Sequence, residues 1–370
     1  MANVEKSGTM KYKDKSGNMT TMYPKTKVAN VEGLEEWDKA MLLKNVAAAM
    51  PIKAFWVSVC HGNDKFVATA FNSTVAAYST DGITWTQTTM PAKAEWRGLH
   101  YANGKFVAVA DDTVAAYSTD GINWTQTTMP THGVWWGVCY GNGKFIAMAD
   151  GPIAAYSTDG INWTQTTMPT NGSEWRYVCY GDGTFVAMDY GSDAAAYSTD
   201  GINWTPTTMP TSGNWMSICY GNGKFVAAIS FSTVAAYSTD GITWTQTTMP
   251  AKAYWNCICY GNGKFIAMAD GPIAAYSTDG INWTQTTLPV NANWKSICYD
   301  NGKFVAVSYY NTVVVYSTDG ITWTNAEYKV VDPANNNVTD NLKTALGTAT
   351  MTEINAAIQS AIQNTWEASY

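Results

Sequence analysis

Apolar residues occur along this chain in short runs that are separated by glycine-containing turns. In one stretch the run 215–220 is followed by Gly-Asn-Gly, a second run covers 225–229, and a third covers 234–238. An Asp-Gly turn then precedes 242–248, where polar and apolar residues alternate up to a proline. Short segments rich in β-branched and aromatic residues, bounded by Asn-Gly or Asp-Gly, predict antiparallel strands joined by hairpins. The stretch therefore predicts four short strands and leaves no room for a helix.

This pattern of four segments is repeated seven times. Each copy contains Tyr-Ser-Thr-Asp-Gly-Ile-Thr/Asn-Trp-Thr, with its tryptophans at Trp85, Trp124, Trp163, Trp204, Trp244, Trp283 and Trp323. A second series of tryptophans leads the copies: Trp56, Trp96, Trp135, Trp175, Trp215, Trp255 and Trp294. A period of about 40 residues is typical of propeller blades or helical pairs, and the strand pattern favours blades. The sequence predicts an all-β fold, a seven-bladed β-propeller with four-stranded blades.

The aspartate of the repeated turn is expected to have a structural role. Its carboxylate and the preceding serine hydroxyl can satisfy backbone N–H groups, while the glycine adopts a positive φ. Seven identical catalytic turns would make little chemical sense. The aspartates are Asp81, Asp120, Asp159, Asp200, Asp240, Asp279 and Asp319.

The turn resembles the Asp box of sialidase-like propellers, Ser-x-Asp-x-Gly-x-x-Trp. Copies such as Ser157-Thr-Asp-Gly-Ile-Asn-Trp163 lack one residue between Asp and Gly. The resemblance supports the propeller. The hydrolases of that family bind the substrate carboxylate with three arginines, alongside Tyr, Glu and Asp catalytic groups. This chain contains only Arg97 and Arg176, which excludes a sialidase mechanism.

Composition and charge exclude several classes of partner. The 370 residues include 22 Lys and Arg against 29 Asp and Glu, a net charge of −7. This balance gives no basic footprint for nucleic acid or an anionic membrane, and no apolar run is long enough to span a bilayer. Six of the seven cysteines stand four residues after a leading tryptophan, so we expect buried, reduced thiols.

Two stretches differ between the copies: the loop between the second and third strands, and the linker from the last strand to the next leading tryptophan. In an up-and-down blade both lie on one face, so the variation maps to a single rim around the channel mouth. Aromatic and cationic residues there suit sugar rings or extended peptides, and the alternative is drift of solvent loops. The candidate binding residues are Arg97, Trp136, Arg176, Tyr177, Tyr190, Phe231, Tyr254, Tyr309 and Tyr310.

Signals for catalysis, metals and cofactors are weak. Acidic loops such as Asp111-Asp112 and 189–193 carry the oxygen ligands that Ca²⁺ prefers, but they lack a complete ligand set at a known spacing. The three histidines are scattered, and no nucleophile, base and carboxylate arrangement or phosphate-binding loop can be read. We therefore expect no metal, no cofactor and no enzymatic activity.

The blades divide the chain into three parts. Residues 1–53 form a predicted attachment and oligomerisation segment, 54–328 the propeller, and 329–370 a helical segment. The N-terminal part predicts a β-hairpin within 9–24 and a helix over 34–50. A capping box, Thr350-x-x-Glu353, opens a C-terminal helix through Gln363, which either packs on the propeller or assembles protomers.

The sequence Met10-Lys-Tyr-Lys-Asp, followed by Met22-Tyr-Pro-Lys-Thr-Lys-Val-Ala-Asn-Val-Glu-Gly-Leu34, resembles the N-terminal attachment segments of tail fibres and baseplate receptor-binding proteins in phages and prophages of Gram-positive bacteria. The resemblance implies a receptor-binding (adhesin) subunit of a phage tail or tailocin, docked to baseplate or tail proteins through its N-terminus and forming a homotrimer. Its variable face would bind a bacterial surface glycan or surface-layer protein.

Such a protein would lie at the tail tip of a virion or tailocin, and it would be made in the host cytoplasm without a signal peptide. Two alternatives remain. One is a structural spacer or decoration protein without a ligand. The other is a glycan-degrading enzyme, which would need two carboxylates across a cleft, although the blades offer few glutamates: Glu95, Glu174 and Glu327.

Overall fold

The computed structural model describes residues 50–326 and five short strands outside that range. These strands are β1 (Asn3–Val4), β2 (Met10–Lys13), β3 (Met19–Met22), β4 (Val46–Ala47) and β30 (Lys329–Val330). β2 pairs with β1 and β3, and its antiparallel pairing with β3 confirms the predicted N-terminal hairpin. β4 pairs antiparallel with β30.

The helix expected over 34–50 is wrong at its C-terminal end. Val46 and Ala47 are extended and pair with Val330 and Lys329, and a β-branched residue such as valine favours an extended backbone over a helix. The remainder of that helix, and the C-terminal helix after Thr350, lie outside the described residues. Residue contacts divide the chain into two compact units, Ala49–Ala326 and Met1–Ala48 with Glu327–Tyr370.

Residues 54–325 contain one antiparallel group of strands for each sequence repeat. The first three groups comprise β5 (Ala54–Gly62), β6 (Lys65–Ala70), β7 (Ser73–Ser79), β8 (Thr86–Ala94), β9 (Gly98–Ala102), β10 (Lys105–Val109), β11 (Asp111–Ser118), β12 (Thr125–Gly141), β13 (Lys144–Ala149), β14 (Ile153–Ser157) and β15 (Thr164–Thr167). β12 is long because it ends the second group and begins the third, pairing with both β11 and β13.

The remaining groups follow the same order. They comprise β16 (Trp175–Gly181), β17 (Thr184–Asp189), β18 (Ala194–Ser198), β19 (Thr205–Thr208), β20 (Trp215–Gly221), β21 (Lys224–Ser238), β22 (Thr245–Gly261), β23 (Lys264–Ala269), β24 (Gly271–Ser277), β25 (Thr284–Ala292), β26 (Trp294–Asp300), β27 (Lys303–Asn311), β28 (Val314–Ser317) and β29 (Thr324–Asn325). β22 joins the fifth and sixth groups, and β21 runs through two segments of the fifth.

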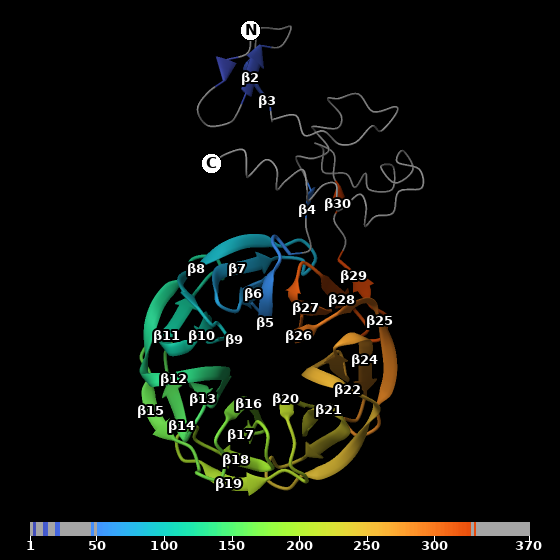
Figure 1. The fold of residues 1–370 in the computed structure, drawn as a ribbon. Coiled ribbons are helices and arrows are strands. Elements are labelled where there is room, and N and C mark those ends of the chain that lie inside the picture. Colours follow the sequence, from blue (N-terminus) through green and yellow to red (C-terminus); the bar gives the residue numbers. More distant parts are fainter. Residues whose placement is uncertain are drawn as a thin grey trace. The chain divides into compact units, whose positions relative to one another are not determined.

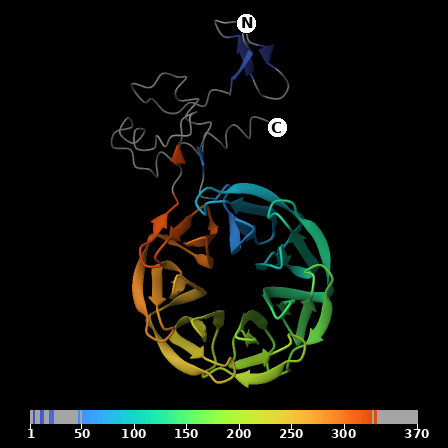
Figure 2. The ribbon, with the colours of Figure 1, turned by 180° about the vertical axis from the view of Figure 1, so that it is seen from behind.

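Within Ala49–Ala326 the strand groups form a closed ring, with the first strand of each group nearest the centre (Figures 1 and 2). The ring closes where β5 meets the last group: Tyr309 of β27 pairs with Phe55. The backbone N–H of Val59 also donates to Ser296 Oγ at 3.0 Å. This arrangement confirms the predicted all-β propeller, and we call each four-stranded group a blade.

The hydrophobic core consists of separate clusters, each shared by two neighbouring blades. In one, Trp135 of the third blade packs with Val107 and Val109 of the second and Phe145 of its own. All seven leading tryptophans are fully buried in this way. Burying such a side chain stabilises the fold by roughly 1.5–3 kcal/mol, and here the gain depends on two blades at once.

The repeated turn is held together by its serine and aspartate. Asp159 Oδ1 accepts hydrogen bonds from the backbone N–H groups of Ile161 and Asn162, both at 2.8 Å. Ser157 Oγ donates to Asp159 Oδ1 and accepts from Gly160 N–H. Gly160 has a φ of 73°, and a Cβ there would lie only 2.7 Å from Val107 Cγ2 of the preceding blade. The turn therefore needs glycine both for its backbone and for blade packing.

Asp159→Ala removes the acceptor of two backbone amides. We expect the free energy of unfolding to fall by about 1–3 kcal/mol, because hydrogen bonds to a charged acceptor are lost. Chemical denaturation measures this change. Asp159→Asn keeps an oxygen at the same place and should cost less. Equal losses in both variants would contradict the assigned hydrogen bonds.

Acid should weaken the fold through these turns. Hydrogen bonding from the Ile321 amide lowers the pKa of Asp319 to about 2, against burial, which acts to raise it. In the other six turns burial is the strongest influence and raises the pKa, yet the amide and hydroxyl hydrogen bonds together outweigh it and lower the pKa. The stabilisation is therefore present above the unfolded pKa near 4 and is lost as the pH falls through the folded values.

We accordingly expect the free energy of unfolding to decrease between about pH 5 and about pH 2. Urea denaturation at a series of pH values measures the slope. The Asp319→Asn variant, which lacks one of the titrating groups, should decline less steeply. A slope that is the same with and without this carboxyl would contradict the account.

Candidate functional site

The two variable stretches of the repeat pair with each other across each blade junction. The loop after the second strand of one blade meets the linker into the next blade through the pairs Asp111↔Val134, Asp150↔Glu174, Tyr190↔Asn214, Ser230↔Tyr254 and Tyr309↔Phe55. The Gly-Asn-Gly turns lie at the opposite ends of the same strands, as the hairpin pair Gly141↔Lys144 shows. Variable side chains therefore gather on one face, at the junctions of the blades.

A row of alternating aromatic and cationic side chains crosses the first four blades. Trp136, in β12, lies between Arg97 and Arg176, and each guanidinium carbon is 4.0 Å from the centre of the Trp136 ring system. Phe71 covers Arg97 at 4.7 Å, and Tyr190 covers Arg176 at 4.2 Å. We call these five residues the cation–aromatic row. Four of them were predicted as binding residues, and the structure brings those four together.

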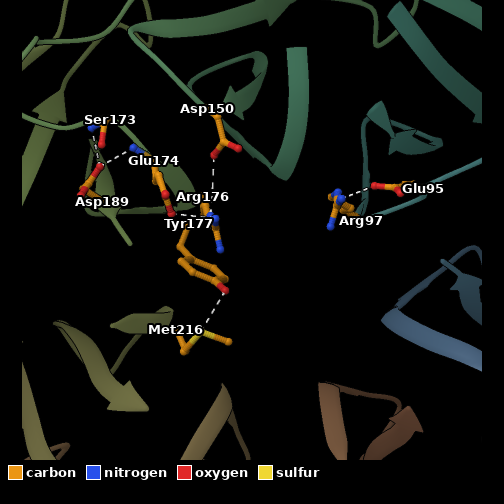
Figure 3. A network of polar contacts seen from close by, with 9 residues as sticks. All are labelled: Glu95, Arg97, Asp150, Ser173, Glu174, Arg176, Tyr177, Asp189 and Met216. Carbon is orange, nitrogen blue, oxygen red and sulfur yellow. Dashed lines mark hydrogen bonds and ion pairs between the residues drawn. The ribbon is translucent and has the colours of Figure 1, made fainter. Parts of the chain in front are cut away.

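The positive charges of the row are compensated locally. Glu95 pairs with Arg97, and Arg176 Nη2 lies 2.7 Å from Glu174 Oε2 (Figure 3). Arg176 Nε is also 3.7 Å from Asp150 Oδ1. Both arginine side chains are mostly covered, with 16% and 17% of their surface exposed.

Hydrogen-bonding capacity nevertheless remains at the row. Trp136 Nε1 and Arg97 Nε are buried without a hydrogen-bond partner among the described residues. Unpaired buried donors are costly unless water or a ligand satisfies them.

A stacked aromatic pair stands at the junction of the fifth and sixth blades. The ring centres of Phe231 and Tyr254 are 4.7 Å apart with planes 26° from parallel, and Lys252 Nζ lies 4.3 Å from the Phe231 ring. These rings are 54% and 49% exposed. The pair is open to solvent, unlike the cation–aromatic row.

A second such group stands where the ring closes, at the junction of the seventh and first blades. Tyr310 stacks on Phe55 with ring centres 4.6 Å apart and planes 22° from parallel, and Lys53 Nζ lies 4.0 Å from the Tyr310 ring. Tyr310 is 54% exposed. Tyr309 packs on Phe55 at 4.7 Å, and Lys295 Nζ is 5.8 Å from the Tyr309 ring.

Phe231 and Tyr310 have strained backbones. Their φ angles are 55° and 53°, in the left-handed region that bulky residues avoid. The matching loop residue has a positive φ in every blade, and elsewhere it is a residue type that tolerates this: Asn72, Asp112, Gly151, Gly191 and Gly271. Holding a side chain in such a conformation costs about 1–3 kcal/mol. The backbone conformation therefore does not explain why these two positions carry aromatic residues.

Tyr177 does not join these groups. Its hydroxyl points to Met216 Sδ of the next blade at 3.4 Å (Figure 3), and burial raises the pKa of its phenol. Sequence reasoning missed Phe71 of the row, and it also missed Phe55, Lys53 and Lys252. A signal for the last three existed, because Phe55 and Tyr254 immediately precede a leading tryptophan, and both lysines stand two residues earlier.

The histidines and cysteines offer little for metal chemistry. Burial lowers the pKa of His100 to about 4, and all seven cysteines are free. Within the part of the chain that the structure describes, no group of three or more His, Cys, Asp or Glu is placed to hold a metal ion. The described residues also include no helix that is long and apolar enough to cross a membrane.

Comparisons with known proteins identify the fold but no family. No protein-family model matches the chain, and no curated protein matches it. A catalytically inactive virginiamycin B lyase from Staphylococcus aureus, solved with quinupristin, is 15% identical with a TM-score of 0.66, covering 74% of this chain and 97% of its own. YCF48 bound to D1 peptide is 15% identical with a TM-score of 0.61, covering 75% and 94%. The WD40 β-propeller domain of Doa1 is 13% identical with a TM-score of 0.58, covering 74% and 97%.

The shared fold is a β-propeller. At these identities the likeness shows the architecture alone. It also corrects one expectation: the exclusion of enzymatic activity does not hold, because a lyase has this fold. Familiar catalytic motifs are therefore not a sufficient test for activity on such a scaffold.

Phe231→Asn tests whether the exposed ring serves the fold. The first blade has an asparagine, Asn72, at the matching loop position, and asparagine tolerates a positive φ. We expect the free energy of unfolding to stay constant or to rise by up to about 1 kcal/mol, since strain is relieved while an exposed stacking contact is lost. Urea denaturation measures it. A decrease of more than about 1 kcal/mol would show that the ring is needed for packing.

Proposed function

We propose that this chain is a receptor-binding (adhesin) subunit of a phage tail or tailocin, and that its variable propeller face binds a bacterial surface glycan or surface-layer protein. One observation carries the proposal. The most exposed large apolar side chains of the described residues, Phe231, Tyr254 and Tyr310, all lie on the variable face. Exposed aromatic side chains in stacked groups are typical of recognition surfaces rather than of solvent loops.

The N-terminal sequence supports the attachment part of the proposal. Residues 10–34 resemble the attachment segments of tail fibres and baseplate proteins, and their first part forms the β2–β3 hairpin. In this proposal residues 1–53 dock to baseplate or tail proteins, the subunit is a homotrimer, and it is located at the tail tip after synthesis in the host cytoplasm.

Ligands seen on similar propellers are compatible with a binding role. YCF48 was solved with a D1 peptide and the lyase with quinupristin, so this architecture accommodates ligands of different chemistry. Specificity on such a scaffold resides in the side chains of the face, since the fold itself serves many functions. The ligand of this chain is therefore argued from its own aromatic and cationic residues.

The test is binding of the fluorescently labelled protein to a panel of Gram-positive bacteria, measured by flow cytometry. We expect strain-selective binding, and we expect Trp136→Ala and Tyr309→Ala to weaken it by roughly threefold to tenfold, the range of a lost aromatic contact. Gln165→Ala, on the exposed strand β15, is the matched control and should bind as the unmodified protein does.

Circular dichroism confirms that each variant is folded. Unchanged binding in both aromatic variants would contradict the proposed face. An absence of binding to every strain would favour a structural spacer. Release of soluble carbohydrate from the cells would indicate a glycan-degrading enzyme.

A further inference from the structure

The same three side chains are assembled at two separate blade junctions. One set is Phe231, Tyr254 and Lys252, and the other is Tyr310, Phe55 and Lys53. We call each set an aromatic–lysine triad. In both, the first residue is the strained loop residue, the second directly precedes a leading tryptophan, and the lysine stands two residues before the second. The stacking distances, 4.7 and 4.6 Å, and the lysine-to-ring distances, 4.3 and 4.0 Å, are nearly the same.

The other five junctions lack the triad at the same positions. In place of the strained aromatic residue they have Asn72, Asp112, Gly151, Gly191 and Gly271, and in place of its stacking partner Glu95, Val134, Glu174, Asn214 and Asn293. The loop adopts the same positive φ with those residues, so neither ring is required by the architecture. Strain that persists at an exposed position points to a role outside folding.

The chemistry of a triad favours a charged sugar. An exposed aromatic ring offers a flat apolar surface to the C–H face of a pyranose, and the neighbouring ammonium attracts an anion. Lys53 and Lys252 are exposed, and no carboxylate among the described residues forms an ion pair with either.

We infer that the two aromatic–lysine triads are equivalent subsites for one anionic polysaccharide, in which each triad stacks a sugar ring and its lysine pairs with the carboxylate or phosphate of the repeat. This inference rests on the proposed function and specifies its ligand. A polymer presents the same repeat many times, so it can occupy both subsites at once. Two linked subsites raise the overall affinity by about 10²- to 10⁴-fold over one subsite alone.

The experiment measures binding of the full-length protein to immobilised polysaccharides by biolayer interferometry. The acidic probes are polygalacturonate, alginate and the acidic polysaccharide extracted from a bacterial strain that the protein binds. The neutral probes are dextran and methyl-esterified polygalacturonate, which keeps the sugar backbone and removes the charge. The variants are Phe231→Asn, Tyr310→Asn, the double variant and, as a matched control at the same loop position, Asn72→Gly.

We expect binding to at least one acidic probe, no binding to the neutral probes, and weakening with added salt. Each single variant should lower the apparent affinity by about 100-fold, to a similar extent, because bivalent binding is lost. The double variant should not bind, and Asn72→Gly should bind as the unmodified protein does.

Other results overturn the inference, and they can be told apart from failure of the proposed function. Binding to cells without binding to any acidic polysaccharide would support the adhesin role but reject the polysaccharide ligand. It would favour a surface protein as the receptor. Equal binding to the neutral and the acidic probes would show that the lysines do not pair with a charge on the ligand. A single variant without effect would show that the triads are not equivalent. An absence of binding to both cells and polysaccharides would reject the proposed function together with the inference.

Discussion

Burial of the leading tryptophans between neighbouring blades is the constraint on which the rest of this structure depends. No blade has a core of its own, because each hydrophobic cluster draws residues from two blades. The first and last blades complete their clusters only when β5 meets β27 and the ring closes. This explains why the apolar residues and the Ser-Thr-Asp-Gly turns are so similar from copy to copy: a change in one blade alters the surface against which the next one packs.

The blade end that carries the junction loops, opposite the Ser-Thr-Asp-Gly turns, is under a much weaker constraint. At the junction loops the backbone requires one residue with a positive φ and one pairing between loop and linker. Any side chain that meets these two requirements leaves the core untouched, which frees this face to carry recognition chemistry. The described face combines a packed, charge-compensated row around Trp136 with two exposed stacks around Phe231 and Tyr310. The row is largely covered, and the exposed stacks provide accessible surface.

Much of this could be predicted from the sequence, because repetition reveals which positions are fixed. The period of the tryptophans and the Asn-Gly and Asp-Gly turns predict the strands and the propeller, and the variable stretches predict which residues share a face. The contacts within the row could not be predicted, since the stacking of Arg97 and Arg176 on Trp136 depends on side chains from three blades. The strained φ of Phe231 has no signal in a single copy, and the pairing of Val46 with Val330 joins segments far apart in the sequence.

The exclusion of enzymatic activity failed because it relied on the absence of familiar catalytic motifs. An enzyme built on the same scaffold does not require those motifs.

The central claim is that the variable face, and not another surface of the propeller, contacts a receptor. Hydrogen–deuterium exchange of the protein, alone and bound to cell envelopes of a strain that it recognises, tests this claim directly. The account predicts slower exchange on binding in the junction segments 230–233, 251–254 and 309–312, with unchanged exchange in the Gly-Asn-Gly turns at 221–223 and 261–263. Protection of those turns, with the junction segments unaffected, would contradict it.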